Sequence, residues 1–250
     1  MQMTGNTIFI TGGTSGIGRG LAEAFHRRGN QVIVAGRREE RLQEICDRCP
    51  GTRRFLLDVT DAAAIRDVAR QAIAGFPSLN CVFNNAGIQL RPNFAPGAAA
   101  DDRDIAREIE TNLLGAIRVA QAFLPHLAAL PAATLVNVSS GLAFVPMARF
   151  PVYCATKAAI HAWTLSLRHQ LRDTGVKVIE LIPPYVGTEL GGPGKPVSAG
   201  RQPMPLDAFI AEAMRELGSD ADELAIGDAK RLVTAACSET VRKLFSAINS

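Results

Sequence analysis

The stretch TIFITGGTSGIG, from Thr7 to Gly18, joins a short apolar run to a glycine-rich turn, and a segment with helical periodicity follows it. The apolar run predicts a buried strand over 7–10, and apolar residues at three- and four-residue steps predict a helix over 18–28. Glycines permit a tight turn and the close approach of a phosphate, and a helix N-terminus offers free N–H groups. The stretch therefore predicts a dinucleotide-binding turn, to which we assign Gly12, Thr14, Ser15, Gly16, Ile17 and Gly18.

The glycines of this turn have the spacing Gly-x3-Gly-x-Gly rather than Gly-x-Gly-x-x-Gly, and no lysine follows the last of them. A P-loop is therefore not favoured, because its lysine reaches the phosphates. A glycine-rich turn could serve any tight connection between a strand and a helix, but the position after the first strand favours a dinucleotide.

The rest of the chain repeats the alternation of apolar runs and helical segments. Further buried strands are predicted over 31–35, 54–57, 81–84, 134–138 and 177–182, and further helices over 62–74, 101–130 and 153–173. This alternation is typical of α/β proteins, so we predict a doubly wound, Rossmann-like parallel sheet with helices on both faces. In the longest helix, the predicted buried face carries Ile105, Ile109, Leu113, Ile117, Phe123, Leu124 and Leu127.

Residues 187–205 break this pattern, because nine of them are Gly or Pro, and an amphipathic stretch over 206–217 follows. The segment could be a linker between two domains, but the remaining chain is short for a second core. We therefore expect a single domain over 1–250, with a substrate flap at about 187–217 over the carboxyl edge of the sheet.

The composition limits the class of partner. The chain has 250 residues and a formal net charge of +3, from 27 basic and 24 acidic residues, which favours a small-molecule partner over nucleic acid. The N-terminus lacks the pattern of a secretory signal, so we expect a cytoplasmic protein. Proline and polar residues interrupt the uncharged stretch 127–148, which therefore does not predict a membrane span.

The cysteines and histidines predict no metal site. Five cysteines are an odd number and fit reduced thiols, and the CxxC spacing of Cys46 and Cys49 has no second pair to complete a zinc site. The four histidines match no ligand spacing such as HExxH.

The second predicted strand is followed by Arg37 and Arg38, at the place where an acidic residue would hold the ribose 2′-hydroxyl of NAD. Arginine side chains instead form charge-assisted bonds to a 2′-phosphate. NADP(H) is therefore favoured over NAD(H). In the alternative interpretation, the two arginines begin a solvated, charged run.

The stretch YCATK places Tyr153 four residues before Lys157 in a predicted helix, so the phenol and the ammonium share one face. A free phenol has a pKa of about 10. A nearby ammonium would lower that pKa, so that Tyr153 could exchange a proton with a substrate oxygen. Considered alone, the pair could also be a packed aromatic residue and a surface charge.

The motifs of the chain, taken together, resemble the short-chain dehydrogenase/reductase family over about residues 5–190. They are TGGTSGIG at 11–18, LDV at 57–59, NNAG at 84–87, NVSS at 137–140 and YCATK at 153–157. The resemblance implies a sheet of about seven strands and a catalytic tetrad of Asn112, Ser140, Tyr153 and Lys157. It also implies cofactor contacts from Asp58, Val59, Asn85, Ala86, Gly87, Tyr153 and Lys157.

Two departures from the family pattern affect what it implies. After the sixth strand, members commonly have Pro-Gly-x-Val-x-Thr, whereas residues 183–188 read PPYVGT. Because Pro183, Val186 and Thr188 are kept, we expect them to contact the nicotinamide side of the cofactor. The tail differs from that of tetrameric members, so the resemblance implies a homodimer through the long helices and leaves a tetramer open.

The resemblance implies an oxidoreductase that transfers a hydride between NADP(H) and a carbonyl compound or secondary alcohol, with Tyr153 as general acid and base. Ser140 would donate to the substrate oxygen, and Asn112 would hold a water behind Lys157. A cofactor-binding sensor without turnover is the alternative. Enoyl reduction expects a longer interval between tyrosine and lysine, and no serine of the NVSS motif sits in the G-x-S-x-G of hydrolases. The candidate substrate-side residues, for which core packing is an equally good explanation, are Leu142, Phe144, Phe150, Tyr185 and Leu190.

Overall fold

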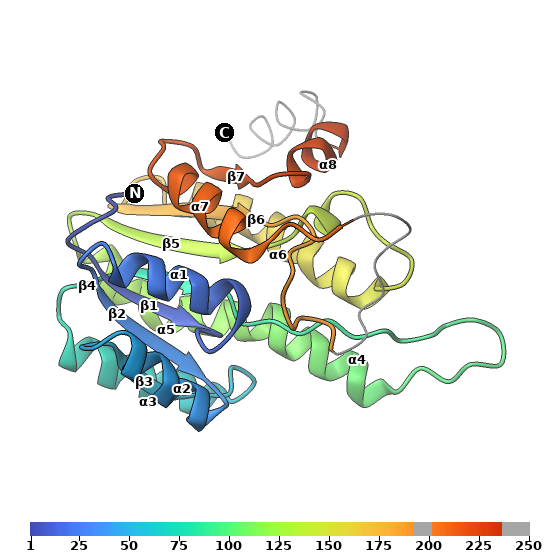
Figure 1. The fold of residues 1–250 in the computed structure, drawn as a ribbon, viewed down its shortest axis with the longest axis horizontal. Coiled ribbons are helices and arrows are strands. Elements are labelled where there is room, and N and C mark those ends of the chain that lie inside the picture. The colour runs from blue at the N-terminus through green and yellow to red at the C-terminus, as the bar shows by residue number, and fades with distance from the viewer. Residues whose placement is uncertain (193–201, 237–250) are drawn as a thin grey trace.

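A seven-stranded sheet in the order β3-β2-β1-β4-β5-β6-β7 forms the centre of the protein. It is seen in a computed structural model, which describes residues 1–192 and 202–236. Every pair of neighbouring strands is parallel, and helices cover both faces of the sheet (Figure 1). The predicted doubly wound, Rossmann-like architecture is therefore confirmed.

The strands and helices alternate along the chain as the sequence predicts. The first six strands lie within two residues of their predicted bounds, whereas the seventh strand and the highly charged second helix were not recognised from the pattern. No helix in the described part of the chain has the length and hydrophobicity needed to cross a bilayer. The strands are β1 (Thr7–Thr11), β2 (Gln31–Gly36), β3 (Arg53–Leu56), β4 (Leu79–Asn84), β5 (Ala133–Val138), β6 (Val176–Ile182) and β7 (Glu223–Ala225). The helices are α1 (Gly16–His26), α2 (Glu39–Arg48), α3 (Ala62–Gly75), α4 (Asp102–Ile109), α5 (Gly115–Ala128), α6 (Pro151–Gln170), α7 (Leu206–Leu217) and α8 (Ala229–Ala236).

Two hydrophobic cores lie on opposite faces of the sheet. Ile8 and Ile10 of β1 pack into the core that contains side chains of α1, α2 and α7. Phe9, between them, packs into the core that contains side chains of α3, α5 and α6. Successive strand residues point to opposite faces, and both faces of a covered parallel sheet are buried. The uninterrupted apolar runs of the sequence follow from this arrangement.

The long helix predicted over 101–130 consists of α4, a π-helical turn over Glu110–Leu114, and α5. A π-helical turn inserts extra residues and rotates the following face of the helix. The buried face of α5 therefore includes Gly115 and Val119 as well as Phe123 and Leu127. The predicted buried face was wrong for Ile109, which is exposed. Ile105, Leu113 and Ile117 are half-buried, and Leu124 is partly buried and packs against the core.

The segment predicted as a flap divides into two parts. Residues 206–217 form α7, in which Phe209, Ala213 and Leu217 are fully buried, and α7 packs against α1. The flap prediction was therefore too long, because this amphipathic helix buries its apolar face in the core. For 187–205 the flap stays a prediction, and 193–201 lie outside the described residues.

The strand order places a crevice at the carboxyl ends of β1 and β4. From β1 the chain runs outward to β2 and β3, and then returns to the other side of β1 as β4. At such a reversal the loops after the two central strands separate, which is where open α/β sheets bind ligands. The loop after β4 also leads into a segment that projects from the body before α4 begins (Figure 1).

Candidate active site

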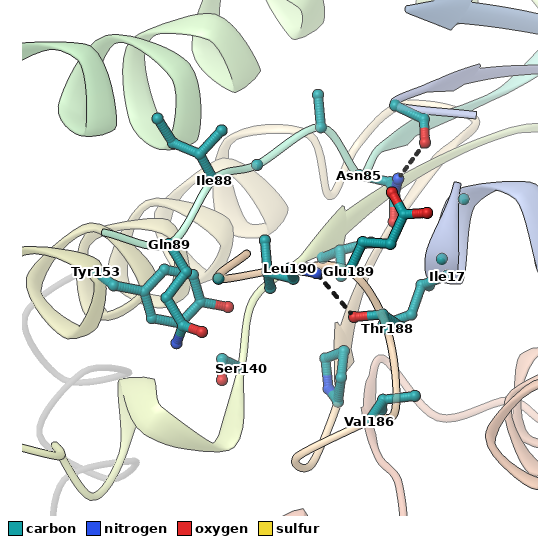
Figure 2. A pocket seen from close by; sticks show the side chains of 18 of the residues that line it. Ile17, Asn85, Ile88, Gln89, Ser140, Tyr153, Val186, Thr188, Glu189 and Leu190 are labelled. Atoms are coloured by element: carbon teal, nitrogen blue, oxygen red, sulfur yellow. Dashed lines mark hydrogen bonds between the residues drawn. The ribbon is translucent and has the colours of Figure 1, made fainter. Parts of the chain in front are cut away.

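A cavity of about 850 Å³ lies at this carboxyl edge, and the described residues that line it come from the segments after β1 to β7, from the π-helical turn, and from α6 and α8. Of the residues predicted for catalysis and cofactor binding, Asn112 is the one that does not line the cavity within the described part of the chain. Figure 2 shows several of the lining side chains from close by. The predicted residues that line the cavity are Gly12, Thr14, Ser15, Gly16, Ile17, Gly18, Arg37, Arg38, Asp58, Val59, Asn85, Ala86, Gly87, Ser140, Tyr153, Lys157, Pro183, Val186 and Thr188.

The glycine turn after β1 has no room for side chains at its key positions. Gly12 has a φ of +66° and Gly16 a φ of +51°, both in the left-handed region that favours glycine. A Cβ atom on Gly18 would lie 2.3 Å from the Gly12 carbonyl oxygen and 2.4 Å from Asn85 Nδ2. Ser15 makes no side-chain capping bond to the described backbone of α1. The close-packed turn and the open helix N-terminus fit a pyrophosphate group.

The hydroxyl of Thr11 connects this turn to the loop after β4. Its Oγ1 accepts the N–H groups of Asn85 at 3.0 Å and Ala86 at 3.1 Å, and it donates to the Phe83 carbonyl at 3.1 Å. Asn85 Nδ2 in turn donates to the Thr11 carbonyl at 2.9 Å. Thr11 is thus a positioning residue, to which the sequence motif alone gave no role.

The arginines after β2 lie beside the glycine turn. Arg38 Nη2 donates to Ser15 Oγ at 2.8 Å, and Arg37 Nη1 lies 3.8 Å from Asp58 Oδ2. The carboxylate of Glu189 lies 2.7 Å from Arg41 Nη1 and 3.3 Å from Arg38 Nη1. The bond from Arg41, with a weaker contribution from Arg38, holds the pKa of Glu189 below its usual value. This cluster has the positive charge that a 2′-phosphate requires.

Tyr153 and Lys157 are both buried on one side of α6, as their spacing predicts. Lys157 Nζ lies 5.7 Å from the centre of the Tyr153 ring. It donates a hydrogen bond to the Val138 carbonyl at 2.8 Å. An ammonium group has three donors. No other acceptor among the described residues is bonded to Nζ, so its remaining donors can serve a ligand.

Burial sets the pKa values of this pair. Burial raises the pKa of Tyr153 far above its ordinary value, and the hydrogen bond with Ser140 opposes this only in part. Burial also lowers the pKa of Lys157 to about 8. The spacing predicts that the ammonium makes the phenol more acidic, but burial is the largest influence on the pKa of this phenol and raises it, because desolvation disfavours the charged form. Tyr153 is therefore protonated at neutral pH.

Asn112 lies in the π-helical turn behind the cavity and is almost fully buried. Its Oδ1 accepts the Ile88 N–H at 2.8 Å, and its Nδ2 donates to the Ile88 carbonyl at 2.9 Å and to Thr156 Oγ1 at 3.2 Å. The side-chain amide thus holds the loop after β4. Both hydrogens of Nδ2 are used in these bonds, so the water predicted for this residue would have to meet one of its oxygen atoms.

Apolar side chains form the end of the cavity beyond Tyr153. The substrate-side prediction was wrong for Phe144, whose ring packs against His161 with centroids 4.4 Å apart. Gln89, a buried polar residue of this lining, was not recognised from the sequence. The predicted Leu142, Phe150, Tyr185 and Leu190 do line the cavity, together with Met147, Met204 and Leu232.

The sheet, its crevice and the glycine turn are those of a dinucleotide-binding α/β fold. The chain belongs to the short-chain dehydrogenase/reductase family, because the model of the family described as short chain dehydrogenase matches residues 6–196.

Relatives and solved structures agree with this assignment. The chain is 46% identical over 190 residues to the Bacillus subtilis protein named uncharacterized oxidoreductase DltE, covering 76% of this chain and 75% of the relative. It is 37% identical to sulfoacetaldehyde reductase 2 of Chromohalobacter salexigens, covering 73% of each chain. Its fold matches a short chain dehydrogenase from Burkholderia cenocepacia, solved in complex with NADP, with a TM-score of 0.81 and 25% identity over 100% of this chain and 99% of that chain.

Proposed function

We propose that this protein is an NADP(H)-dependent oxidoreductase that interconverts a carbonyl compound and a secondary alcohol. The observation that carries the proposal is the joint lining of one cavity by the glycine turn and by Ser140, Tyr153 and Lys157. The NADP complex of the structurally similar Burkholderia cenocepacia protein supports the choice of cofactor. So do Arg37 and Arg38 in the lining, whereas NAD(H) would need no such charge.

The proposed cofactor contacts follow the length of the cavity. The turn at Gly12–Gly18 would hold the pyrophosphate, and Asp58 and the loop at Asn85–Gly87 would contact the adenosine. Thr188 lies against the turn, because a Cβ atom on Gly16 would be 3.2 Å from Thr188 Cβ. Pro183 and Val186 would contact the nicotinamide, and Lys157 its ribose, while the bound cofactor supplies the hydride.

The proposed proton chemistry favours carbonyl reduction. A carbonyl oxygen must gain a proton as hydride arrives, and burial keeps Tyr153 in the protonated form that can donate one. The Ser140 hydroxyl, which accepts the Leu142 N–H at 3.1 Å and hydrogen-bonds Tyr153, can donate to the same oxygen. A positive charge on Lys157 then stabilises the phenolate that the proton transfer leaves.

We also propose a cytoplasmic homodimer. Ile105, Leu113 and Ile117 are half-buried and Ile109 is exposed, so that an apolar stripe follows the outer side of the helical run from α4 to α5. Pairing of this stripe with a second copy would remove apolar surface from water, which is the main favourable contribution to most protein association.

The activity is tested by mixing the protein with NADPH and a panel of ketones and aldehydes while following NADPH absorbance. Tyr153→Phe should lower kcat by a factor of about 10² to 10⁴, the usual contribution of a general acid, and should leave NADPH affinity unchanged. Tyr185→Phe removes the other phenol hydroxyl of the chain and should retain turnover. Full turnover by Tyr153→Phe would contradict the role of Tyr153. NADPH binding without oxidation by any carbonyl compound would favour the sensor instead.

A further inference from the structure

Gln89 is a polar residue of the cavity that the proposed chemistry does not use. Its side chain is 8% exposed, and its Oε1 is buried without a hydrogen-bond partner among the described residues. In Figure 2 the side chain extends from the loop after β4 toward the end of the cavity where Ser140 and Tyr153 lie. An unmade hydrogen bond at a buried polar group costs about 1–3 kcal/mol. A ligand that supplies the missing partner would recover that free energy.

The backbone on both sides of Gln89 is fixed by buried side chains. Ile88, on one side, is bonded through both its N–H and its carbonyl to the amide of Asn112. Leu90, on the other side, donates its N–H to Glu108 Oε1 at 2.8 Å, and Glu108 is fully buried. These bonds hold the backbone on both sides of Gln89, so the side chain starts from a defined position, which is what a specificity-determining group needs.

The surroundings of Gln89 are apolar. Phe150 and Tyr153 belong to a small hydrophobic cluster, against which Leu142, Met147 and Leu190 pack. All of these residues line the cavity. A carbonyl substrate would therefore meet these apolar side chains together with the carboxamide of Gln89, while the other carboxamides of the described lining belong to Asn85 and Gln202.

The charges of the lining argue against an anionic substrate. In the described part of the lining, the cations are Arg37, Arg38 and Lys157, and the proposed cofactor engages all of them. The acidic residues Glu189 and Asp228 also line the cavity. Glu189 is paired with Arg38 and Arg41, and Arg91, whose Cζ lies 5.6 Å from the centre of the Phe150 ring, does not line the cavity. A carboxylate or sulfonate of a substrate would thus find no cation in the described lining beyond those that the cofactor engages, and burying an unpaired charge is costly.

We propose that the substrate is an uncharged, largely apolar carbonyl compound with a second hydrogen-bonding group, a hydroxyl or an amide, which Gln89 binds. This inference rests on the proposed oxidoreductase function and names the substrate class of the same site. A carboxamide offers both a donor and an acceptor, so it can pair with either kind of neutral group. Gln89 is then a specificity-determining residue rather than a participant in proton transfer.

The test uses methyl ketones of matched chain length that end in a methyl, a hydroxyl or a carboxylate group, over several chain lengths. For each, kcat/KM with NADPH and the Kd for the NADPH complex are measured in the native protein and in Gln89→Leu. In the native protein, the best hydroxy ketone should exceed its methyl analogue by about tenfold or more, since one unmade bond to a buried polar group has that effect. The carboxylate should be the poorest of the three. Gln89→Leu should remove the preference by weakening the hydroxy ketone and improving the methyl analogue.

A matched control is Gln71→Leu, which makes the same chemical change at an exposed position on α3 and should leave the ratio unchanged. An equal loss for all three ketones in Gln89→Leu, an unchanged ratio, or a preference for the carboxylate would overturn the inference. So would a series in which no hydroxy ketone binds to the NADPH complex better than its methyl analogue. Failure of the proposed function has a different result: the native protein would bind NADPH and oxidise it with none of the ketones, while the Kd values would still report on Gln89.

Discussion

The double substitution Arg37→Ala and Arg38→Ala should weaken NADPH binding selectively. Both side chains line the cavity beside the glycine turn, and their exposed fractions are 55% and 45%. Two unit charges 4 Å apart attract each other by about 1 kcal/mol in water and by about 4 kcal/mol near a protein surface. For half-exposed groups we take the lower value for each arginine, because solvent screens such pairs. The phosphate must also displace Glu189 from Arg38, which offsets part of any larger gain.

The expected loss of about 2 kcal/mol corresponds to an increase of about 30-fold in the Kd for NADPH. NADH has no 2′-phosphate, so its Kd should change by less than about twofold. Titration of the nicotinamide fluorescence at one fixed, moderate ionic strength measures both constants, since salt screens exposed charges. Of the single variants, Arg38→Ala should have the larger effect, because its bond to Ser15 holds the guanidinium beside the turn.

The control for this experiment is Arg66→Ala, which removes an exposed positive charge on α3, away from the cavity lining. It should leave both Kd values unchanged. If the double variant lost NADPH and NADH affinity equally, the arginines would support the fold of the turn and would not recognise a phosphate. If neither affinity changed, the positive cluster would play no part in cofactor binding.

Two other predictions follow from buried and exposed groups on α4. Burial raises the pKa of Glu108 to about 6, so its contribution to stability is present below its unfolded pKa and is lost as the pH rises through 6. Glu108→Gln keeps an acceptor for Leu90. It should raise the free energy of unfolding by up to about 2 kcal/mol near pH 7.5 and by almost nothing near pH 4.5, as measured by urea titration. An equal change at both pH values would show that burial of the charge is not the cause. In sedimentation experiments the native protein should be a dimer of the 26.6 kDa polypeptide, and Ile109→Glu should shift it toward monomer. A native protein that is monomeric at micromolar concentration would refute the proposed pairing through the apolar stripe that contains Ile109.

The sheet and the glycine turn could be predicted because local sequence determines them. A strand buried on both faces appears as a continuous apolar run, as in β1, and a turn without room for Cβ atoms must contain glycine. The four-residue spacing of Tyr153 and Lys157 likewise predicted that they lie on one face of α6. In these cases the residues that matter are neighbours in the chain, so a short window contains the necessary information.

The remaining features depend on contacts between distant parts of the chain. Glu189 reaches Arg38 across 151 positions, and no local pattern indicates that pairing. The π-helical turn at Glu110–Leu114 changed which residues face the core, whereas a uniform helical repeat predicted Ile109 to be buried. Burial raises the pKa of Tyr153, whereas the sequence predicted a lowered pKa. The sequence could not show this, because desolvation depends on all the residues packed around the phenol.

The Thr11 hydroxyl has a mechanical consequence for the cleft. This hydroxyl, together with the bonds from Asn85 Nδ2 to the Thr11 and Gly12 carbonyls, connects the turn that would hold the phosphates to the loop that carries Gln89. A shift of either loop would therefore strain its bonds to the other. The separation of the loops after β1 and β4 thus depends on the bonds at Thr11 and not on either loop alone. Thr11→Val would keep the shape of the residue and remove the bonds of its hydroxyl to Asn85 and Ala86. The loop after β1 and the loop after β4 should then both become more mobile.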